Sequence, residues 1–232
     1  MSGRTLVVTV DGTAGSGKST IARKFAYRWN ALYINSGLLY RSVGYRVMQE
    51  GLSRDDSPRL RQVVETIEWD MCRTDSGETA LLVDGRLPVA DLYTEEVAAV
   101  ASELAMLSVV RGVCTLFQRD QASRHPRVVV EGRDGGTEVF PDAIAKWYVD
   151  APLMVRAHRR LSQLQRIAPH GRFAIDEIAE QIRSRDARDA GRALAPQRPA
   201  EDAFRVDTGA DKQSDTLRTM EGVVRERSAA NE

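Results

Sequence analysis

One octapeptide near the start of the chain limits the possible folds most strongly: Gly12-Thr13-Ala14-Gly15-Ser16-Gly17-Lys18-Ser19. It follows a β-rich run at residues 6–10 and precedes a helical pattern from residue 18 to about residue 29. Glycines in such a turn let backbone N–H groups curve around an anionic oxygen, and the helix N-terminus adds the positive end of its dipole. The sequence therefore predicts a phosphate-binding loop (P-loop) in an α/β protein.

The P-loop predicts binding of a nucleoside triphosphate, with Lys18 reaching the β- and γ-phosphates and the Ser19 hydroxyl binding Mg²⁺. The predicted triphosphate-binding residues are Gly12, Thr13, Ala14, Gly15, Ser16, Gly17, Lys18, Ser19 and Thr20. A GTPase would need the guanine-binding tetrapeptide N-K-x-D, which does not occur. The apolar run at 128–130 ends at Glu131, a possible Walker-B acid, so a motor or transporter ATPase stays possible.

Five short β-rich segments alternate with helical patterns, at residues 6–10, 32–34, 128–130, 146–149 and 204–207. This alternation predicts a three-layer α/β core with a five-stranded parallel sheet. Two segments interrupt it. Residues 67–73 and 79–87 flank a turn at 74–77 and read as an antiparallel hairpin. Residues 158–192 are rich in Arg, with a loop at 168–171 and a helix from about residue 173.

Composition limits the partners and the compartment. The 33 basic and 33 acidic residues balance, which argues against a general nucleic-acid or membrane-surface binder. Cys72 and Cys114 lie far apart and form no CxxC pair, as expected in a reducing compartment. The N-terminus shows no signal-peptide pattern, and the apolar tract at 97–110 is interrupted by polar residues. We therefore expect a cytoplasmic protein, and a monomer.

Three further segments place arginines beside polar groups. Glu131 is followed by Gly132-Arg133-Asp134, at a strand end where α/β proteins bind ligands, although a surface ion pair would look the same. The second strand ends in Asn35-Ser36-Gly37-Leu38-Leu39-Tyr40-Arg41, in which Ser36 could cap the next helix. Arg185, Asp189 and Arg192 are spaced i, i+4, i+7, so they share one face if the helix lasts that far; solvated ion pairs are the alternative.

Taken together, these segments resemble the bacterial cytidylate kinases, within the adenylate-kinase-like family of P-loop nucleoside monophosphate kinases. Residues 35–41 are similar to that family's D-[ST]-G-x-x-Y-R, and residues 132–143 to its G-R-D-x-G-T-x-x-x-P-D-A. Residues 156–160 and 185–196 look like its lid and post-lid segments. The resemblance covers nearly the whole chain. It implies a P-loop core at 1–41, 96–155 and 193–232, a region binding the nucleoside monophosphate (NMP) with an antiparallel insert at 42–95, and a helical lid with post-lid helix at 156–192.

The resemblance also implies a reaction and a role for each matching residue: transfer of the ATP γ-phosphoryl group to CMP or dCMP with Mg²⁺. Lys18, Arg156 and Arg160 would serve the transferring group, and Arg133 would act in catalysis and in binding the acceptor. The acceptor phosphate would be held by Arg41, Arg133 and Arg192, the ribose by Ser36, Arg185 and Asp189, and the cytosine by Ser102, Arg111 and Asp134.

Three departures from the family pattern bear on the acceptor. Asn35 replaces the usual Asp, Gly135 replaces a bulky apolar residue, and Tyr93 replaces Arg. They leave open a paralogous kinase of a modified pyrimidine monophosphate. A non-catalytic nucleotide-sensing protein is the alternative from another class, although intact Lys18 and Arg133 disfavour it.

Overall fold

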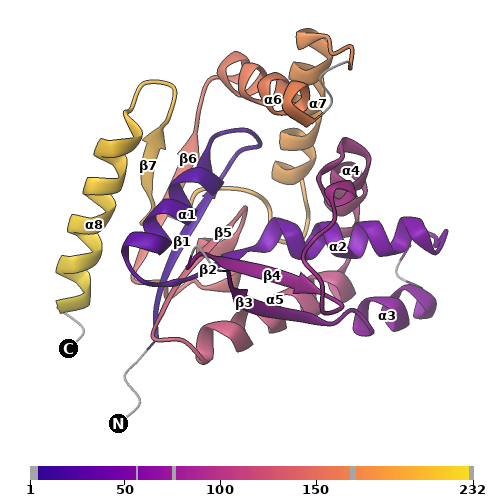
Figure 1. The fold of residues 1–232 in the computed structure, drawn as a ribbon, viewed down its shortest axis with the longest axis horizontal. Helices are drawn as coiled ribbons and strands as arrows, with labels where there is room; N and C mark the ends of the chain where they lie inside the picture. Colours follow the sequence, from indigo (N-terminus) through magenta and orange to yellow (C-terminus); the bar gives the residue numbers. More distant parts are fainter. Residues whose placement is uncertain (1–4, 56, 75–76, 168–170, 230–232) are drawn as a thin grey trace.

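The computed structural model describes residues 5–55, 57–74, 77–167 and 171–229 (Figure 1). Five parallel strands form one sheet in the order β2-β5-β1-β6-β7. They are β1 (Leu6–Gly12), β2 (Leu32–Asn35), β5 (Arg127–Gly132), β6 (Ala145–Asp150) and β7 (Phe204–Asp207). All five predicted strands and their parallel arrangement are confirmed.

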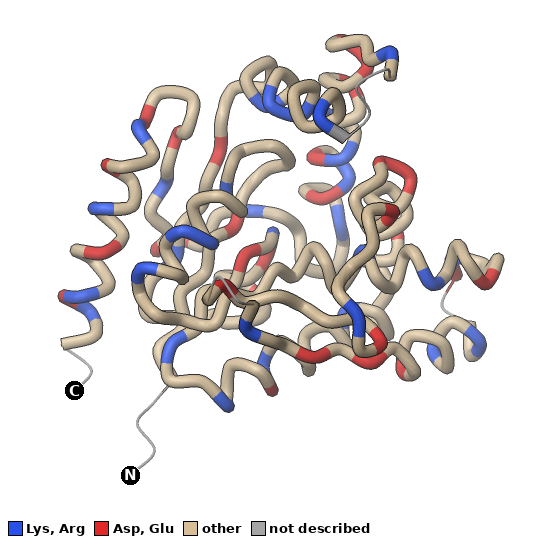
Figure 2. The backbone as a smooth tube through the Cα atoms, viewed as in Figure 1, with Lys and Arg blue, Asp and Glu red and all other residues tan. Residues whose placement is uncertain are grey.

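Helices cover both faces of this sheet and make three layers. On one face, α1 (Lys18–Arg28) and α8 (Gln213–Ala229) pack against Val8, Val10 and Trp147. On the other face, α5 (Ser108–Ser123) packs against apolar residues of β2 and β5. Strands covered on both faces need continuous apolar runs, which is why Val128-Val129-Val130 is fully buried. Lys, Arg, Asp and Glu are interspersed along the outer helix α8 (Figure 2).

A second apolar cluster packs together the helices that lie between β2 and β5 in the sequence. It joins α2 (Ser36–Gln49), α3 (Pro58–Glu65), α4 (Glu95–Leu104) and α5, with the 3-10 turn η1 (Ala90–Tyr93) leading into α4. Ser57 caps α3 by accepting from the Leu60 N–H at 3.1 Å, and Pro58 occupies the first turn. Thr94 caps α4 in the same way.

The predicted hairpin is present as β3 (Trp69–Arg73) paired antiparallel with β4 (Thr79–Val83). Its second strand is shorter than the expected 79–87, because Asp84 and Gly85 both adopt positive φ (50° and 72°) and reverse the chain. Within the predicted turn, residues 75–76 lie outside the described residues. Thr79 docks the hairpin on β2, accepting from the Tyr33 N–H at 2.9 Å and donating to the Tyr33 carbonyl at 3.1 Å.

Two helices, α6 (Leu153–Ile167) and α7 (Ile175–Ala190), lie above the carboxyl ends of the strands (Figure 1). They pack on each other and on the P-loop through Ala14, Ala157 and Ile182. The expected loop at 168–171 falls mostly outside the described residues. Within the described part of the chain, no single helix could cross a membrane by length and hydropathy. Among the described helices, α4 and α5 meet that test when taken together, with a bend of 99° between them.

Candidate active site

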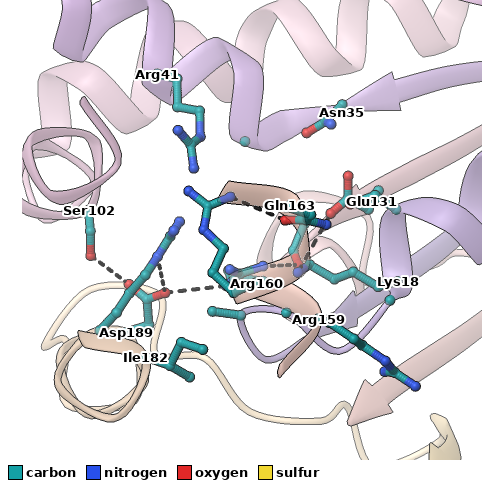
Figure 3. Close-up of a pocket in the computed structure, with 18 of the residues that line it drawn as sticks. Lys18, Asn35, Arg41, Ser102, Glu131, Arg159, Arg160, Gln163, Ile182 and Asp189 are labelled. Carbon is teal, nitrogen blue, oxygen red and sulfur yellow. Dashed lines mark hydrogen bonds and ion pairs between the residues drawn. The ribbon is translucent and has the colours of Figure 1, made fainter. Parts of the chain in front are cut away.

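The carboxyl ends of β1, β2 and β5 open into a cavity of about 800 Å³. Its walls come from the P-loop, α2, α4, the loop after β5, and the helices α6 and α7. Figure 3 shows cationic side chains entering it from several of these elements, with Lys18 on one side and Arg41 and Arg160 across from it.

At two positions of the P-loop a residue other than glycine would either clash or strain the backbone. A Cβ at Gly12 would lie 1.9 Å from the Val149 carbonyl oxygen, so β1 and β6 can approach this closely only with glycine there. Gly17 is the N-cap of α1 and has a φ of 87°, in the left-handed region. The local sequence therefore determines the loop geometry, with the N-terminus of α1 facing the cavity.

Lys18 is 5% exposed, and its ammonium group lies between a backbone carbonyl and a carboxylate. Its Nζ donates to the Thr13 carbonyl at 3.0 Å and lies 3.7 Å from Glu131 Oε1. The other carboxylate oxygen of Glu131 accepts from the Tyr33 hydroxyl at 3.0 Å. Burial and repulsion by Arg133 lower the pKa of Lys18 to about 7, partly opposed by Glu131.

Two arginines of α6 bond to the backbone of the P-loop. Arg156 is buried behind the P-loop, donating to the carbonyls of Ala14 at 3.0 Å and Ala151 at 2.9 Å and pairing with Asp186. Arg159 donates to the Ser16 carbonyl at 3.2 Å and to Thr208 Oγ1 at 2.8 Å.

Arg160 crosses the cavity instead. It pairs with Glu95, the first residue of α4, and donates to the Tyr93 carbonyl at 3.4 Å. In this way α6 is tied to the start of α4, on the other side of the cavity.

Asp189 joins several arginines and a serine that line the cavity. Its carboxylate is 1% exposed, pairs with Arg192, and accepts from Arg133 Nε at 3.2 Å and from Ser102 Oγ at 2.8 Å. Arg185 Nε lies 3.8 Å away. Although burial raises the pKa of Asp189, Arg133, Arg192 and Arg185 together lower it to about 2.

The shared helix face depended on the helix reaching Arg192, and this condition is not met, because α7 ends at Ala190. Arg192 reaches Asp189 from the loop after the helix rather than from its next turn. The capping role considered for Ser36 is also not observed. The N-cap of α2 is Asn35, and Ser36 Oγ instead donates to the Glu131 carbonyl at 2.8 Å.

Arg41 and Asp134 also line the cavity. Arg41 donates to the carbonyls of Leu92 at 2.7 Å and Thr94 at 3.2 Å, and burial together with Arg160 lowers its pKa to about 10. Asp134 forms a buried ion pair with Arg111.

The cavity brings together most of the predicted site residues, from segments far apart in the sequence. The predicted residues that line it are Ala14, Gly15, Gly17, Lys18, Ser19, Thr20, Ser36, Arg41, Ser102, Arg133, Asp134, Arg160, Arg185, Asp189 and Arg192. Those that do not line it, among the described residues, are Gly12, Thr13, Ser16, Arg111 and Arg156. The motifs gave no role to Arg159 or Glu95, both of which line the cavity.

The three departures from the family pattern fall on different parts of the site. Asn35 and Tyr93 line the cavity, whereas Gly135 is buried in the loop behind it.

Comparison with known proteins gives a consistent result. The family model described as cytidylate kinase matches residues 8–225. A cytidylate kinase of Nitratidesulfovibrio vulgaris strain Hildenborough is 41% identical over 206 residues, covering 88% of this chain and 85% of that protein. One from Coxiella burnetii is 35% identical over 226 residues, covering 97% and 94%.

Among solved structures, an uncharacterized protein from Eubacterium ventriosum superposes with a TM-score of 0.54 at 10% identity. That alignment covers 95% of this chain and 98% of the other, and it bears on the fold alone. The match of the family model over nearly the whole chain, together with the identity to these two relatives, shows that the chain belongs to the cytidylate kinase family.

Proposed function

We propose that this protein transfers the γ-phosphoryl group of ATP to CMP or dCMP. The observation that carries the proposal is an excess of buried cationic charge around one cavity. Burial and neighbouring cations lower the pKa of Lys18 to about 7 and of Arg41 and Arg185 to about 10. An anionic ligand stabilises cations whose charged form is disfavoured in this way, and the phosphates of two nucleotides would supply the negative charge.

The donor side follows from the P-loop. Its backbone N–H groups and the N-terminus of α1 would surround the ATP phosphates, and Lys18 would leave the Thr13 carbonyl to contact the β- and γ-phosphates. Arg160 faces the same space and would neutralise charge on the transferring group, while Arg156 would act by holding the P-loop. Phosphoryl transfer depends mainly on such positioning and charge neutralisation.

The acceptor side would use the arginines around Asp189. Two of their buried donors, Arg185 Nε and Arg192 Nε, have no hydrogen-bond partner among the described residues, as expected where a ligand oxygen binds. We assign the acceptor phosphate to Arg41, Arg133 and Arg192, the ribose to Ser36, Arg185 and Asp189, and the base to Ser102, Arg111 and Asp134. Because Arg111 lies behind the cavity wall, it would act on the base largely through its ion pair with Asp134.

Mg²⁺ would be held chiefly by the nucleotide. The described residues contain no group of three or more His, Cys, Asp or Glu placed to bind a metal. Mg²⁺ in kinases commonly takes one or two protein ligands and completes its shell with water and phosphate oxygens. The Ser19 hydroxyl and the Glu131 carboxylate both line the cavity and are hard oxygen donors that suit this role. The metal would supply charge neutralisation on the phosphates.

The division into a core, an NMP-binding region at 42–95 and a lid at 156–192 remains a proposal. It is supported by the position of α6 and α7 above the strand ends and by the Arg160–Glu95 pair, which joins the two sides of the cavity. Closure of such a lid would exclude water and so protect ATP from hydrolysis. A monomeric state and a cytoplasmic location stay predictions from the sequence.

The test is a coupled assay of ADP release with ATP, Mg²⁺ and a panel of monophosphates: CMP, dCMP, UMP, AMP and a 5-methylated cytidine monophosphate. CMP and dCMP should give the highest kcat/KM. Faster turnover of the methylated nucleotide would favour a paralogous kinase, and nucleotide binding without ADP release would favour a sensor. Lys18→Ala should abolish transfer while the protein stays folded, and retained turnover would contradict the donor-site assignment.

A further inference from the structure

Asp11, at the end of β1, makes a contact that the proposed roles leave unused. Its side chain is buried, with the residue only 5% exposed, and it points toward the loop that follows β5. Oδ1 accepts from the Gly135 N–H at 2.9 Å and Oδ2 from the Gly136 N–H at 2.8 Å. One carboxylate therefore anchors two successive amides of that loop.

The anchored amides come directly after the two residues that face the acceptor. Arg133 and Asp134 immediately precede Gly135, and their side chains bond to Asp189 and Arg111 respectively. The parallel register places Asp11 opposite Gly132. The two hydrogen bonds of Asp11 therefore join the end of β1, just before the P-loop, to the loop at 132–136. Fixing the backbone at 135–136 limits where the preceding two side chains can lie.

We propose that Asp11 is a positioning residue for the acceptor nucleotide, holding the loop at 132–136 so that Arg133 and Asp134 face the acceptor side of the cavity. This inference rests on the proposed function. It also accounts for the small residue at Gly135, where a Cβ would lie 3.1 Å from Asp11 Oδ1, a tight contact.

The chemistry requires a carboxylate rather than its amide. Both oxygens of Asp11 accept, whereas Asn presents one oxygen and one NH₂ group, which would oppose the N–H of Gly135 or Gly136. Burial and the nearby Asp134 raise the pKa of Asp11 to about 7, while the two amide bonds and Arg133 act in the opposite direction. Burying a polar group costs free energy unless it is hydrogen-bonded, and the two amide bonds supply this compensation.

The kinetic test compares Asp11→Asn with Thr9→Val. Thr9 lies two residues earlier on β1 and packs against the same loop, but its buried hydroxyl has no hydrogen-bond partner among the described residues, so its isosteric change is a matched control. Asp11→Asn should raise the KM for CMP at least tenfold, about 1.4 kcal/mol in free energy, and leave the KM for ATP within about twofold. Thr9→Val should change neither.

The outcomes separate the two proposals. Partial unfolding of the variant would lower kcat without shifting either KM, so a CMP-selective rise in KM marks positioning. An unchanged KM for CMP, or equal increases for CMP and ATP, would overturn the role of Asp11 while the proposed function stands. A wild-type enzyme that does not phosphorylate CMP would overturn both.

A second test uses the wild-type chain and does not depend on the variant folding. In a pH titration followed by NMR, the amide protons of Gly135 and Gly136 should shift together in one transition, near pH 7, as Asp11 is protonated. Two amide protons that shift in separate transitions would show that one carboxyl group does not anchor both.

Discussion

Replacing Asp189 with Asn should destabilise the protein strongly, because this carboxylate is almost fully buried among arginines. Its pKa is lowered from 3.8 to about 2, which corresponds to about 2 kcal/mol of stabilisation of the charged form. Removing one partner from a buried ion pair typically costs about 3–5 kcal/mol, since the remaining charges stay buried. We therefore expect Asp189→Asn to lower the free energy of unfolding by about 2–5 kcal/mol at pH 7.

The pH dependence of this loss follows from the direction of the pKa shift. A carboxyl group whose pKa is depressed in the folded state contributes stability above its unfolded pKa, and loses it as the pH falls through the folded value. The difference between wild type and variant should stay constant from pH 8 to about pH 4 and shrink between pH 4 and pH 2. Added sulfate should restore part of the loss, because an anion can pair with the arginine charges that the variant leaves without a carboxylate.

Urea unfolding followed by circular dichroism would measure this difference, with Asp120→Asn as the matched control. Asp120 and Asp189 both lie in the last turns of 16-residue helices, and each pairs with an arginine. The side chain of Asp120 is 46% exposed, so its loss should cost less than about 1 kcal/mol. If Asp189→Asn costs no more than the control, the arginines do not depend on this carboxylate and our account of the acceptor side is wrong.

Three further predictions concern the ligands. Arg133→Ala should raise the KM for CMP by at least tenfold with little effect on the KM for ATP, since a charge-assisted hydrogen bond contributes about 1.5–3 kcal/mol. A selective loss of ATP binding would show that Arg133 contacts ATP rather than CMP. Asp134→Asn should lower the ratio of kcat/KM for CMP to that for UMP, because an amide accepts less well from the cytosine amine; an unchanged ratio would remove Asp134 from base recognition. ATP binding should take up a proton at Lys18 and weaken as the pH rises above about 7, measured by calorimetry in buffers of different ionisation enthalpy; heats independent of the buffer would contradict this.

The sequence predicted those parts of the molecule that depend on local physics. The P-loop was predictable because its backbone needs glycine at fixed positions within eight residues, as the left-handed φ of Gly17 shows. The strands were predictable because a strand buried on both faces must be apolar throughout, as at 128–130. Where the prediction erred, the cause was also local: β4 ends early at Asp84 and Gly85, and α7 ends before Arg192.

The contacts that organise the cavity were not predictable from the residues. Asp189 meets Ser102 across 87 positions and Arg133 across 56, and no short pattern records that pairing. Taken alone, Arg185 and Asp189 look like a solvated i, i+4 pair, although Asp189 is almost fully buried. Resemblance to a family supplied the candidate residues, but it did not show that Arg156 bonds to the P-loop backbone while Arg160 crosses to Glu95.

The order of the strands explains why the proposed donor and acceptor sites share one cavity. The P-loop follows β1, and the loop that carries Arg133 follows β5. These two strands are adjacent and parallel, with Asp11 opposite Gly132. Parallel neighbours end at the same edge of the sheet, so Lys18 and Arg133 must face the same space, close enough to lower the pKa of Lys18. The bonds from Asp11 to Gly135 and Gly136 then fix the second loop relative to the first. In-line transfer between two phosphates needs this fixed relation, because a small misalignment costs much of the rate.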